Sequence, residues 1–361
     1  MKVLTLTTQY ANNMGALLQC YALSRFINGI KGVDCQVIDY HPDDANKSWT
    51  IFRKPTSIRD LVKICLTAIM VHKYPARIKS NKEVRRFINE FIPLTEQRYD
   101  SIAIKTNPPL ADVFVCGSDQ IWNPDLFHND LTYYFDFTKQ GKKIAYAASA
   151  TQVWDQTFAR KVQPLLKDFS AISMREDINL DQVSFLSGLN VTTTIDPVFL
   201  LSAEQWMSVA YEPAVKEPYI LCYFIGTDKH YNDIIKLIRS KTGYKVVHLN
   251  VNLHSWVKAD YDILNVHPQM FVGYIARASY VLTNSFHCSA FSIIFKRHLK
   301  FIRKTKANSR VETLCRCFNL DNFIIDKTDK NIVLPTLYNN VLDGMEYIEK
   351  SKQFIRDALT K

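Results

Sequence analysis

The sequence predicts an α/β fold of two doubly wound, Rossmann-like domains that face each other across a cleft. Strand-like and helix-like segments alternate along most of the chain, and several strand-like segments end in Ser, Gly, Asp or Arg. The alternation stops once, near residue 210, and then starts again. A chain of 361 residues is long enough for two domains that each bury a substantial core.

The first predicted domain covers residues 1–210 and opens with a strand, a helix and a second strand. Residues 3–7 and 35–40 are rich in apolar and β-branched side chains, whereas residues 15–27 carry apolar side chains at helical spacing. Residues 42–108 are less regular, so we expect an inserted helical segment there. Helices within it are predicted at 57–72 and 79–91, and further strands of the domain at 112–116, 143–149, 171–175 and 192–197.

The second predicted domain covers residues 211–335. The sequence EPAVKEP, which ends at Pro218, interrupts both periodicities and marks the boundary. Strands are then predicted at 219–224, 245–249, 279–283 and 299–302, with helices at 229–241 and 268–278. An amphipathic helix over 336–358, within a C-terminal segment 336–361, is expected to pack back on the first domain.

Composition is that of a globular protein, with 47% hydrophobic and 22% charged residues. No apolar run approaches the roughly 20 residues of a membrane span, and the first residues resemble a strand rather than a signal peptide. The eight cysteines are scattered without the spacing of a disulfide or zinc framework. These features favour the cytoplasm.

The net charge of +10 indicates an anionic partner without identifying it. The chain has no recognisable nucleic-acid-binding motif, so we expect no nucleic acid as partner. A phosphorylated small substrate and the anionic inner leaflet of a membrane both fit, and so does a solvated basic surface without a partner.

One histidine occupies a position typical of a functional residue. His287 lies between a predicted strand at 278–283 and a helical pattern at 289–295, next to Asn284 and Ser285. In parallel sheets, ligands bind beyond the carboxyl ends of the strands, where helix N-termini attract anions. His287 is therefore a candidate acid catalyst, although a helix-start histidine bonded to the backbone would give the same pattern.

Four ordered segments resemble the polysaccharide pyruvyl transferase family, over roughly residues 3 to 320. They are NNMGALLQCYAL at 12–23, VFVCGSDQIWNPD at 113–125, AISMREDINLDQVSFLSGLNVTTTIDPVFLL at 171–201, and TNSFHCSAFSIIF from 283 with HPQMFVGYIARASYVL before it. The resemblance implies a glycosyltransferase-B-like fold. It also implies transfer of pyruvyl from phosphoenolpyruvate to a hexose of a surface polysaccharide or its lipid-linked precursor, forming a pyruvate ketal.

That reaction assigns roles to individual residues. His287 would protonate the donor's methylene carbon. Arg175 follows a predicted strand, matches the Ser-x-Arg-Glu motif of the family, and would bind the donor's anionic groups; a structural ion pair with Glu176, Asp177 or Asp196 is the alternative. The substrate-binding candidates are Asn12, Asn13, Gly15, Gly117, Ser118, Asp119, Asn284, Ser285, Lys304, Lys306 and Arg310.

No cofactor and no metal is expected, because the chain lacks G-x-G-x-x-G, Walker and H-E-x-x-H motifs and the chemistry requires neither. Cys288 and His298 depart from the family pattern, which leaves the acceptor less certain than the reaction. Two other functions remain open. They are a nucleotide-sugar glycosyltransferase on the same fold and a catalytically silent carbohydrate-binding or assembly protein.

Overall fold

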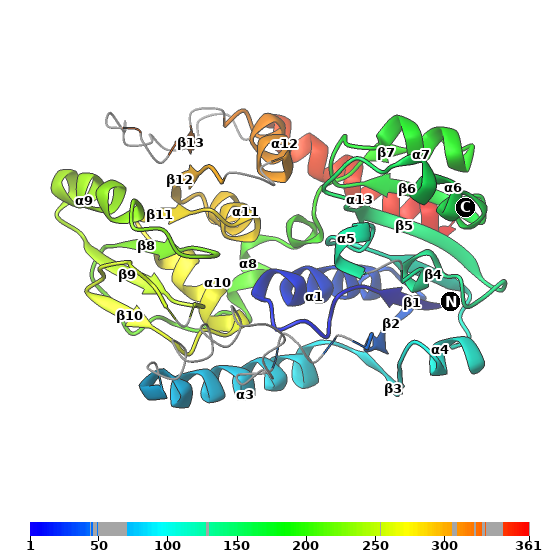
Figure 1. Ribbon diagram of the computed structural model, residues 1–361, viewed down its shortest axis with the longest axis horizontal. Helices are drawn as coiled ribbons and strands as arrows, with labels where there is room; N and C mark the ends of the chain where they lie inside the picture. Colours follow the sequence, from blue (N-terminus) through cyan, green and yellow to red (C-terminus); the bar gives the residue numbers. More distant parts are fainter. Residues whose placement is uncertain are drawn as a thin grey trace.

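The structure is a computed structural model in which two parallel β-sheets flanked by helices lie side by side (Figure 1). This architecture confirms the predicted fold class. The residues described are 1–43, 45, 49, 71–127, 130–252, 254–304, 309–320, 323–326, 329 and 342–360.

The first sheet has seven parallel strands in the order β3-β2-β1-β4-β5-β6-β7. Their bounds are β1 Lys2–Leu6, β2 Asp34–Tyr40, β3 Leu94–Tyr99, β4 Val113–Cys116, β5 Lys142–Ala148, β6 Phe169–Met174 and β7 Thr192–Thr193. The strand order reverses between β1 and β4, which is the position where doubly wound sheets bind ligands.

The second sheet has six parallel strands in the order β10-β9-β8-β11-β12-β13. Their bounds are β8 Tyr219–Tyr223, β9 Lys245–Leu249, β10 Tyr261–Ile263, β11 Tyr280–Thr283, β12 His298–Ile302 and β13 Ile324–Ile325. Here the order reverses between β8 and β11. The predicted domain boundary lies in the connection between β7 and β8.

Helices cover both sheets. Those of the first half are α1 Met14–Asn28, α3 Tyr74–Phe91, α4 Ala103–Thr106, α5 Pro124–Phe127, α6 Gln156–Leu166, α7 Leu180–Ser187 and α8 Ala203–Met207, with 3-10 helices η2 Val71–Lys73, η3 Thr132–Tyr134 and η4 Pro197–Leu200. Those of the second half are α9 Tyr231–Thr242, α10 Pro268–Arg277, α11 Phe286–Ile294, α12 Ser309–Cys317 and α13 Leu342–Thr360.

Helix α1 joins the two halves through its apolar surface. Its start is fixed by Asn13, whose side chain accepts hydrogen bonds from the Gly15 and Ala16 amides. Further along, Tyr21 packs on Trp206 with ring centroids 5.6 Å apart, and Trp206 packs edge-on against Phe291 of α11 at 4.8 Å. These rings belong to one core that contains residues of both sheets, so the halves are packed together rather than loosely linked.

The segment predicted as a helical insertion contains a strand that the sequence did not indicate. β3 forms an edge of the first sheet, and its residues LTEQRY are mostly exposed or half-buried, so no apolar alternation marks it. Helix α3 begins at Tyr74, earlier than predicted, with Pro75 in its first turn. The Ser80 hydroxyl on α3 donates to the Val266 carbonyl of the second half, 2.5 Å away. The helix predicted at 57–72 falls mostly outside the described residues.

Helix α13 lies against the first half, where both chain termini are found (Figure 1). Ile355, Ala358 and Leu359 share a core cluster with residues of β1, α1 and β4. The Ser351 hydroxyl of α13 accepts a hydrogen bond from the Ile195 amide at 3.0 Å. The chain between β7 and η4 is therefore held from outside the sheet.

Among the described residues, no helix combines the length and hydropathy needed to cross a membrane.

Candidate active site

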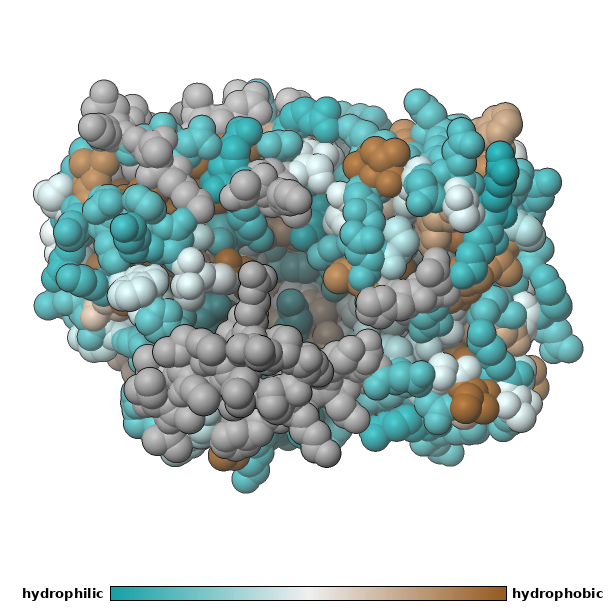
Figure 2. All heavy atoms as spheres, in the orientation of Figure 1, coloured by the Kyte–Doolittle hydropathy of each residue, from teal (hydrophilic) through white to brown (hydrophobic). Residues whose placement is uncertain are grey.

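The carboxyl ends of the central strands from both sheets meet at one place. The loop after β1 leads to Gly15, and residue 287 lies in the first turn of α11, immediately after β11. A Cβ atom added to Gly15 would overlap the His287 imidazole, so the two halves touch at this position. On the face seen in Figure 2, the molecule is hollowed where its halves meet.

Asp196 links His287 to Arg175. Its Oδ2 atom lies 2.6 Å from Arg175 Nη1 and 3.5 Å from His287 Nε2, and its Oδ1 accepts from the Val198 amide. Burial raises the pKa of this carboxyl, but the neighbouring His287 and Arg175 lower it by more. The net pKa is well below the usual value, so Asp196 is ionised at neutral pH and supplies one negative charge to two basic groups.

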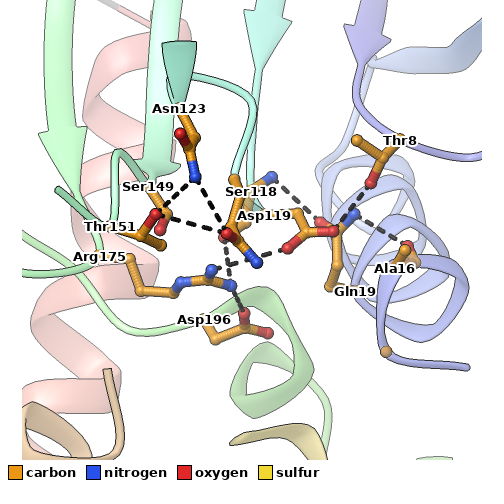
Figure 3. A network of polar contacts seen from close by, with 12 residues as sticks. Thr8, Ala16, Gln19, Ser118, Asp119, Asn123, Ser149, Thr151, Arg175 and Asp196 are labelled. Carbon is orange, nitrogen blue, oxygen red and sulfur yellow. Dashed lines mark hydrogen bonds and ion pairs between the residues drawn. The ribbon is translucent and has the colours of Figure 1, made fainter. Parts of the chain in front are cut away.

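Arg175 is buried among polar groups of the first half (Figure 3). Nη1 lies 3.4 Å from the Ser118 hydroxyl, Nη2 lies 3.7 Å from Asp119 Oδ1, and Nε lies 3.9 Å from Glu176 Oε2. Burial lowers the pKa of this guanidinium, but Asp196, Glu176 and Asp119 reverse that effect and raise it. Within the described part of the chain, Nε and Nη2 make no hydrogen bond, although each lies within ion-pair distance of one of these carboxylates.

Hydrogen bonds fix the acidic neighbours of Arg175. The Thr8 hydroxyl donates to Asp119 Oδ2 at 2.9 Å, which ties the loop after β4 to the loop after β1 (Figure 3). Glu176 Oε1 accepts from the Ser149 hydroxyl at 2.7 Å and from two backbone amides. These carboxylates are thus held as part of the scaffold that surrounds the guanidinium.

Two further cations gather near Arg175. The guanidinium carbons of Arg175 and Arg310 lie 5.0 and 5.7 Å from the centre of the Phe286 ring. Burial, and then the charge of Arg175, lower the pKa of Arg310 to about 10. Burial, and then Arg310, also lower the pKa of Lys304. The positive charge is thus destabilised on Arg310 and Lys304, chiefly by burial, whereas the carboxylates around Arg175 stabilise the charge of that guanidinium.

The remaining candidates have mostly structural contacts. Asn13 caps α1, and Ser285 caps α11 through the Cys288 amide. Asn284 bonds the backbone of Ile225 and the Tyr231 hydroxyl, and so joins the loops after β8 and β11. The Asn12 side-chain amide donates to Asn81 Oδ1, and a Cβ atom added to Gly117 would overlap the Tyr146 carbonyl. The Ser118 amide donates to Gln19 Oε1, and the Ser118 hydroxyl donates to the Ala147 carbonyl. Lys306 lies outside the described residues.

The structure adds two residues to the predicted set. Asp196 appeared in the sequence only as an alternative partner for Arg175, although its position after a short strand and before Pro197 is a signal for a polar group at the sheet edge. Phe286 precedes the histidine and contacts both arginines. Helix α11 begins at Phe286 rather than at 289, so His287 belongs to its first turn.

Gly15→Ala should lower activity while leaving the protein folded. Alanine favours a helix over glycine by about 1 kcal/mol, but its methyl group would displace the His287 ring. We expect kcat to fall by at least roughly tenfold with little change in the melting temperature. Steady-state kinetics and thermal unfolding measure both. Gly29→Ala, at the far end of α1, is the control, and equal activity of the two variants would contradict the placement of His287.

Among the described residues, no group of three or more His, Cys, Asp or Glu side chains is placed to hold a metal ion. The charges of this site are those of arginine, lysine, histidine and carboxylate side chains.

Two doubly wound parallel sheets with a buried polar site at their meeting edges define an α/β protein of the kind that binds ligands beyond its strand ends. A family model described as polysaccharide pyruvyl transferase matches residues 13–298. The chain belongs to the polysaccharide pyruvyl transferase family and is a transferase.

Several solved structures are similar over almost the whole chain. The UDP-GlcNAc 2-epimerase of Neisseria meningitidis, bound to UDP-GlcNAc, is 12% identical with a TM-score of 0.48, and covers 99% of each chain. The UDP-GlcNAc 2-epimerase of Methanocaldococcus jannaschii is 10% identical with a TM-score of 0.45, covering 100% of this chain and 93% of its own. A putative epimerase of Listeria monocytogenes is 12% identical with a TM-score of 0.46, covering 98% and 90%. No curated protein sequence matches the chain.

Proposed function

We propose that the protein transfers the pyruvyl group of phosphoenolpyruvate to a hexose of a surface polysaccharide or its lipid-linked precursor, forming a pyruvate ketal. The observation that carries this proposal is the shared carboxylate. Asp196 contacts Arg175 of the first half and His287 of the second. One site thus combines a proton carrier with an anion-binding group, and pyruvyl transfer from phosphoenolpyruvate requires both.

The donor would bind through its two anionic groups. Arg175 has two nitrogen atoms without a hydrogen bond among the described residues, and Arg310 approaches the same phenyl ring. Guanidinium groups suit carboxylate and phosphate because they offer paired donors. Phosphate near Arg310 and Lys304 would relieve the destabilised positive charge that their lowered pKa values indicate.

In the proposed reaction, His287 donates a proton to the methylene carbon of phosphoenolpyruvate, which becomes a methyl group and leaves a cationic centre at the adjacent carbon. One sugar hydroxyl attacks that centre, and a second hydroxyl then displaces phosphate. One hydroxyl proton returns to His287 and the other leaves with the phosphate. Asp196 would orient the imidazole.

We place this reaction in the cytoplasm. The net charge of +10 supports peripheral contact with an anionic inner leaflet when the acceptor is lipid-linked.

Phosphoenolpyruvate should raise the melting temperature of the purified protein, whereas a UDP-sugar should not. A ligand at 100 times its Kd stabilises the folded state by about 2.7 kcal/mol, which a thermal shift detects readily. Arg310→Gln should weaken this stabilisation by roughly tenfold in apparent Kd, because a hydrogen bond to a charged group is lost. Arg303→Gln, with an exposed side chain paired to Glu312, is the matched control.

Stabilisation by a UDP-sugar without any response to phosphoenolpyruvate would instead support a glycosyltransferase. Release of inorganic phosphate only when phosphoenolpyruvate and a glycan acceptor are both present would complete the test.

A further inference from the structure

A cavity opens beyond the ends of β1 and β2, on the side of α3. It has a volume of about 320 Å³, within the roughly 300–1,000 Å³ typical of small-molecule sites. Its lining consists of Gln9, Tyr10, Asp39, His41, Trp49, Arg85, Ile88, Asn89, Leu94 and Arg98. None of these residues was among the sequence candidates.

The wall of this cavity offers a buried hydrogen-bond acceptor. Gln9 is 1% exposed, and its amide nitrogen donates to the Tyr40 carbonyl at 2.8 Å. Its Oε1 atom has no hydrogen-bond partner among the described residues. An unpaired buried carbonyl costs about 1–3 kcal/mol, and a ligand hydroxyl would remove that cost.

Aromatic rings form another part of the lining. The Trp49 indole is oriented by its Nε1 atom, which donates to the Tyr10 carbonyl at 2.7 Å. The Tyr10 and His41 rings lie 6.1 Å apart, centre to centre. Flat apolar rings beside a small number of fixed polar groups are suited to a sugar ring, which has apolar faces and a hydroxylated rim.

The charges favour an anionic ligand. Asp39 accepts from His41 Nε2 and from Arg98 Nε, each at 2.8 Å, so its negative charge is already compensated. Arg85 lies with its guanidinium carbon 4.9 Å from the Trp49 ring centre. In the part of the chain that the structure describes, Arg85 has no ion pair or hydrogen bond, so its charge is not paired with a carboxylate although it lies over the Trp49 ring.

The cavity is connected to the candidate active site through the loop after β1. Gln9 follows Thr8, whose hydroxyl holds Asp119 beside Arg175, and Asn13 at the end of this loop caps α1 just before Gly15. A ligand in the cavity would therefore lie against the loop that leads into α1, whose second residue, Gly15, contacts His287.

We infer that this cavity is an acceptor subsite that binds an acidic pyranose, a sugar ring bearing a carboxylate or phosphate. That the bound sugar is the acceptor rests on the proposed function. That the cavity binds an acidic sugar does not depend on it. Gln9 accepts a ring hydroxyl, Trp49 packs on the ring, and Arg85 binds the anionic group.

Isothermal titration of the full-length protein with methyl β-D-glucuronide and methyl β-D-glucoside tests the assignment. The two probes differ only at carbon 6, so we expect the glucuronide to bind roughly tenfold more tightly. Glucose 6-phosphate tests whether the subsite prefers a phosphate to a carboxylate. Preferential binding of either acidic sugar over the glucoside supports the subsite. Equal affinity for all three probes, or binding of none, overturns it.

Arg85→Gln should abolish the preference for the acidic sugar. Arg86→Gln is the matched control, because Arg86 is the next residue of α3 and pairs with Glu90 instead. Both side chains are exposed, so both variants should fold, and thermal unfolding verifies this. A preference that survives Arg85→Gln overturns the assignment.

Titrations repeated in saturating phosphoenolpyruvate separate the two sites. Binding of the glucuronide should persist, because the donor occupies the Arg175 site; loss of binding would overturn the subsite. If phosphoenolpyruvate stabilises the protein but no acidic sugar binds, the subsite fails alone. If the acidic sugar binds through Arg85 and phosphoenolpyruvate has no effect, the proposed function fails and the cavity remains a sugar site.

Discussion

Replacing His287 with alanine should lower kcat by roughly 10²- to 10⁴-fold and leave the fold intact. The expected loss equals the usual contribution of general acid catalysis by a positioned side chain. Its imidazole touches Asp196 and the start of α1, so its removal takes away the only imidazole that is placed at this contact among the described residues. Phosphate release at saturating phosphoenolpyruvate measures kcat, and circular dichroism measures folding.

His230→Ala is the control for this variant. His230 pairs with Asp228 and has a side chain that is 52% exposed, so its loss should not affect turnover. Retention of full activity by His287→Ala would remove the imidazole from the mechanism.

Asp196→Asn should be the most destabilising single change at the site. The carboxylate is fully buried between Arg175 and His287, and removing one partner of a buried ion pair costs about 3–5 kcal/mol. Denaturant unfolding of both proteins at pH 7 gives the difference directly. Asp177→Asn, at the exposed pair with Arg316, should cost at most about 1 kcal/mol.

The difference in unfolding free energy between wild type and Asp196→Asn should shrink as the pH falls into the acid range. The pKa of Asp196 in the folded state lies below its ordinary value of 3.8, so the unfolded chain takes up a proton first as pH falls. The stabilisation is therefore complete above about pH 4 and declines at lower pH. A difference between wild type and Asp196→Asn that stays constant down to acid pH would contradict the assigned ionisation.

Much of the fold follows from local patterns in the sequence. The strand predicted at 245–249 has the observed bounds, and β8, β11 and β12 differ from their predictions by one residue. These strands are largely buried and rich in apolar and β-branched residues, so the local pattern identifies them even though β9 and β12 contain Lys and His. β3 was missed because its polar residues lie at a sheet edge, where burial imposes no pattern.

The candidate site was less predictable, since it depends on contacts between residues distant in sequence. The alternatives for Arg175 included an ion pair with Asp196, and this contact exists. Nothing local indicates that the same carboxylate reaches His287, because that contact requires both sheets to be in place. Sequence patterns locate polar residues at strand ends, but packing decides which of them meet.

The hydrogen bond from the Ile195 amide to the Ser351 hydroxyl affects the order in which the site can assemble during synthesis. A ribosome delivers the chain from its N-terminus, so the first sheet emerges long before α13. Ile195 and Ser351 are separated by 156 positions, and Asp196 directly follows Ile195. The segment that carries this carboxylate therefore receives this hydrogen bond only after the whole second sheet has been synthesised, so the site is completed after the second half of the fold.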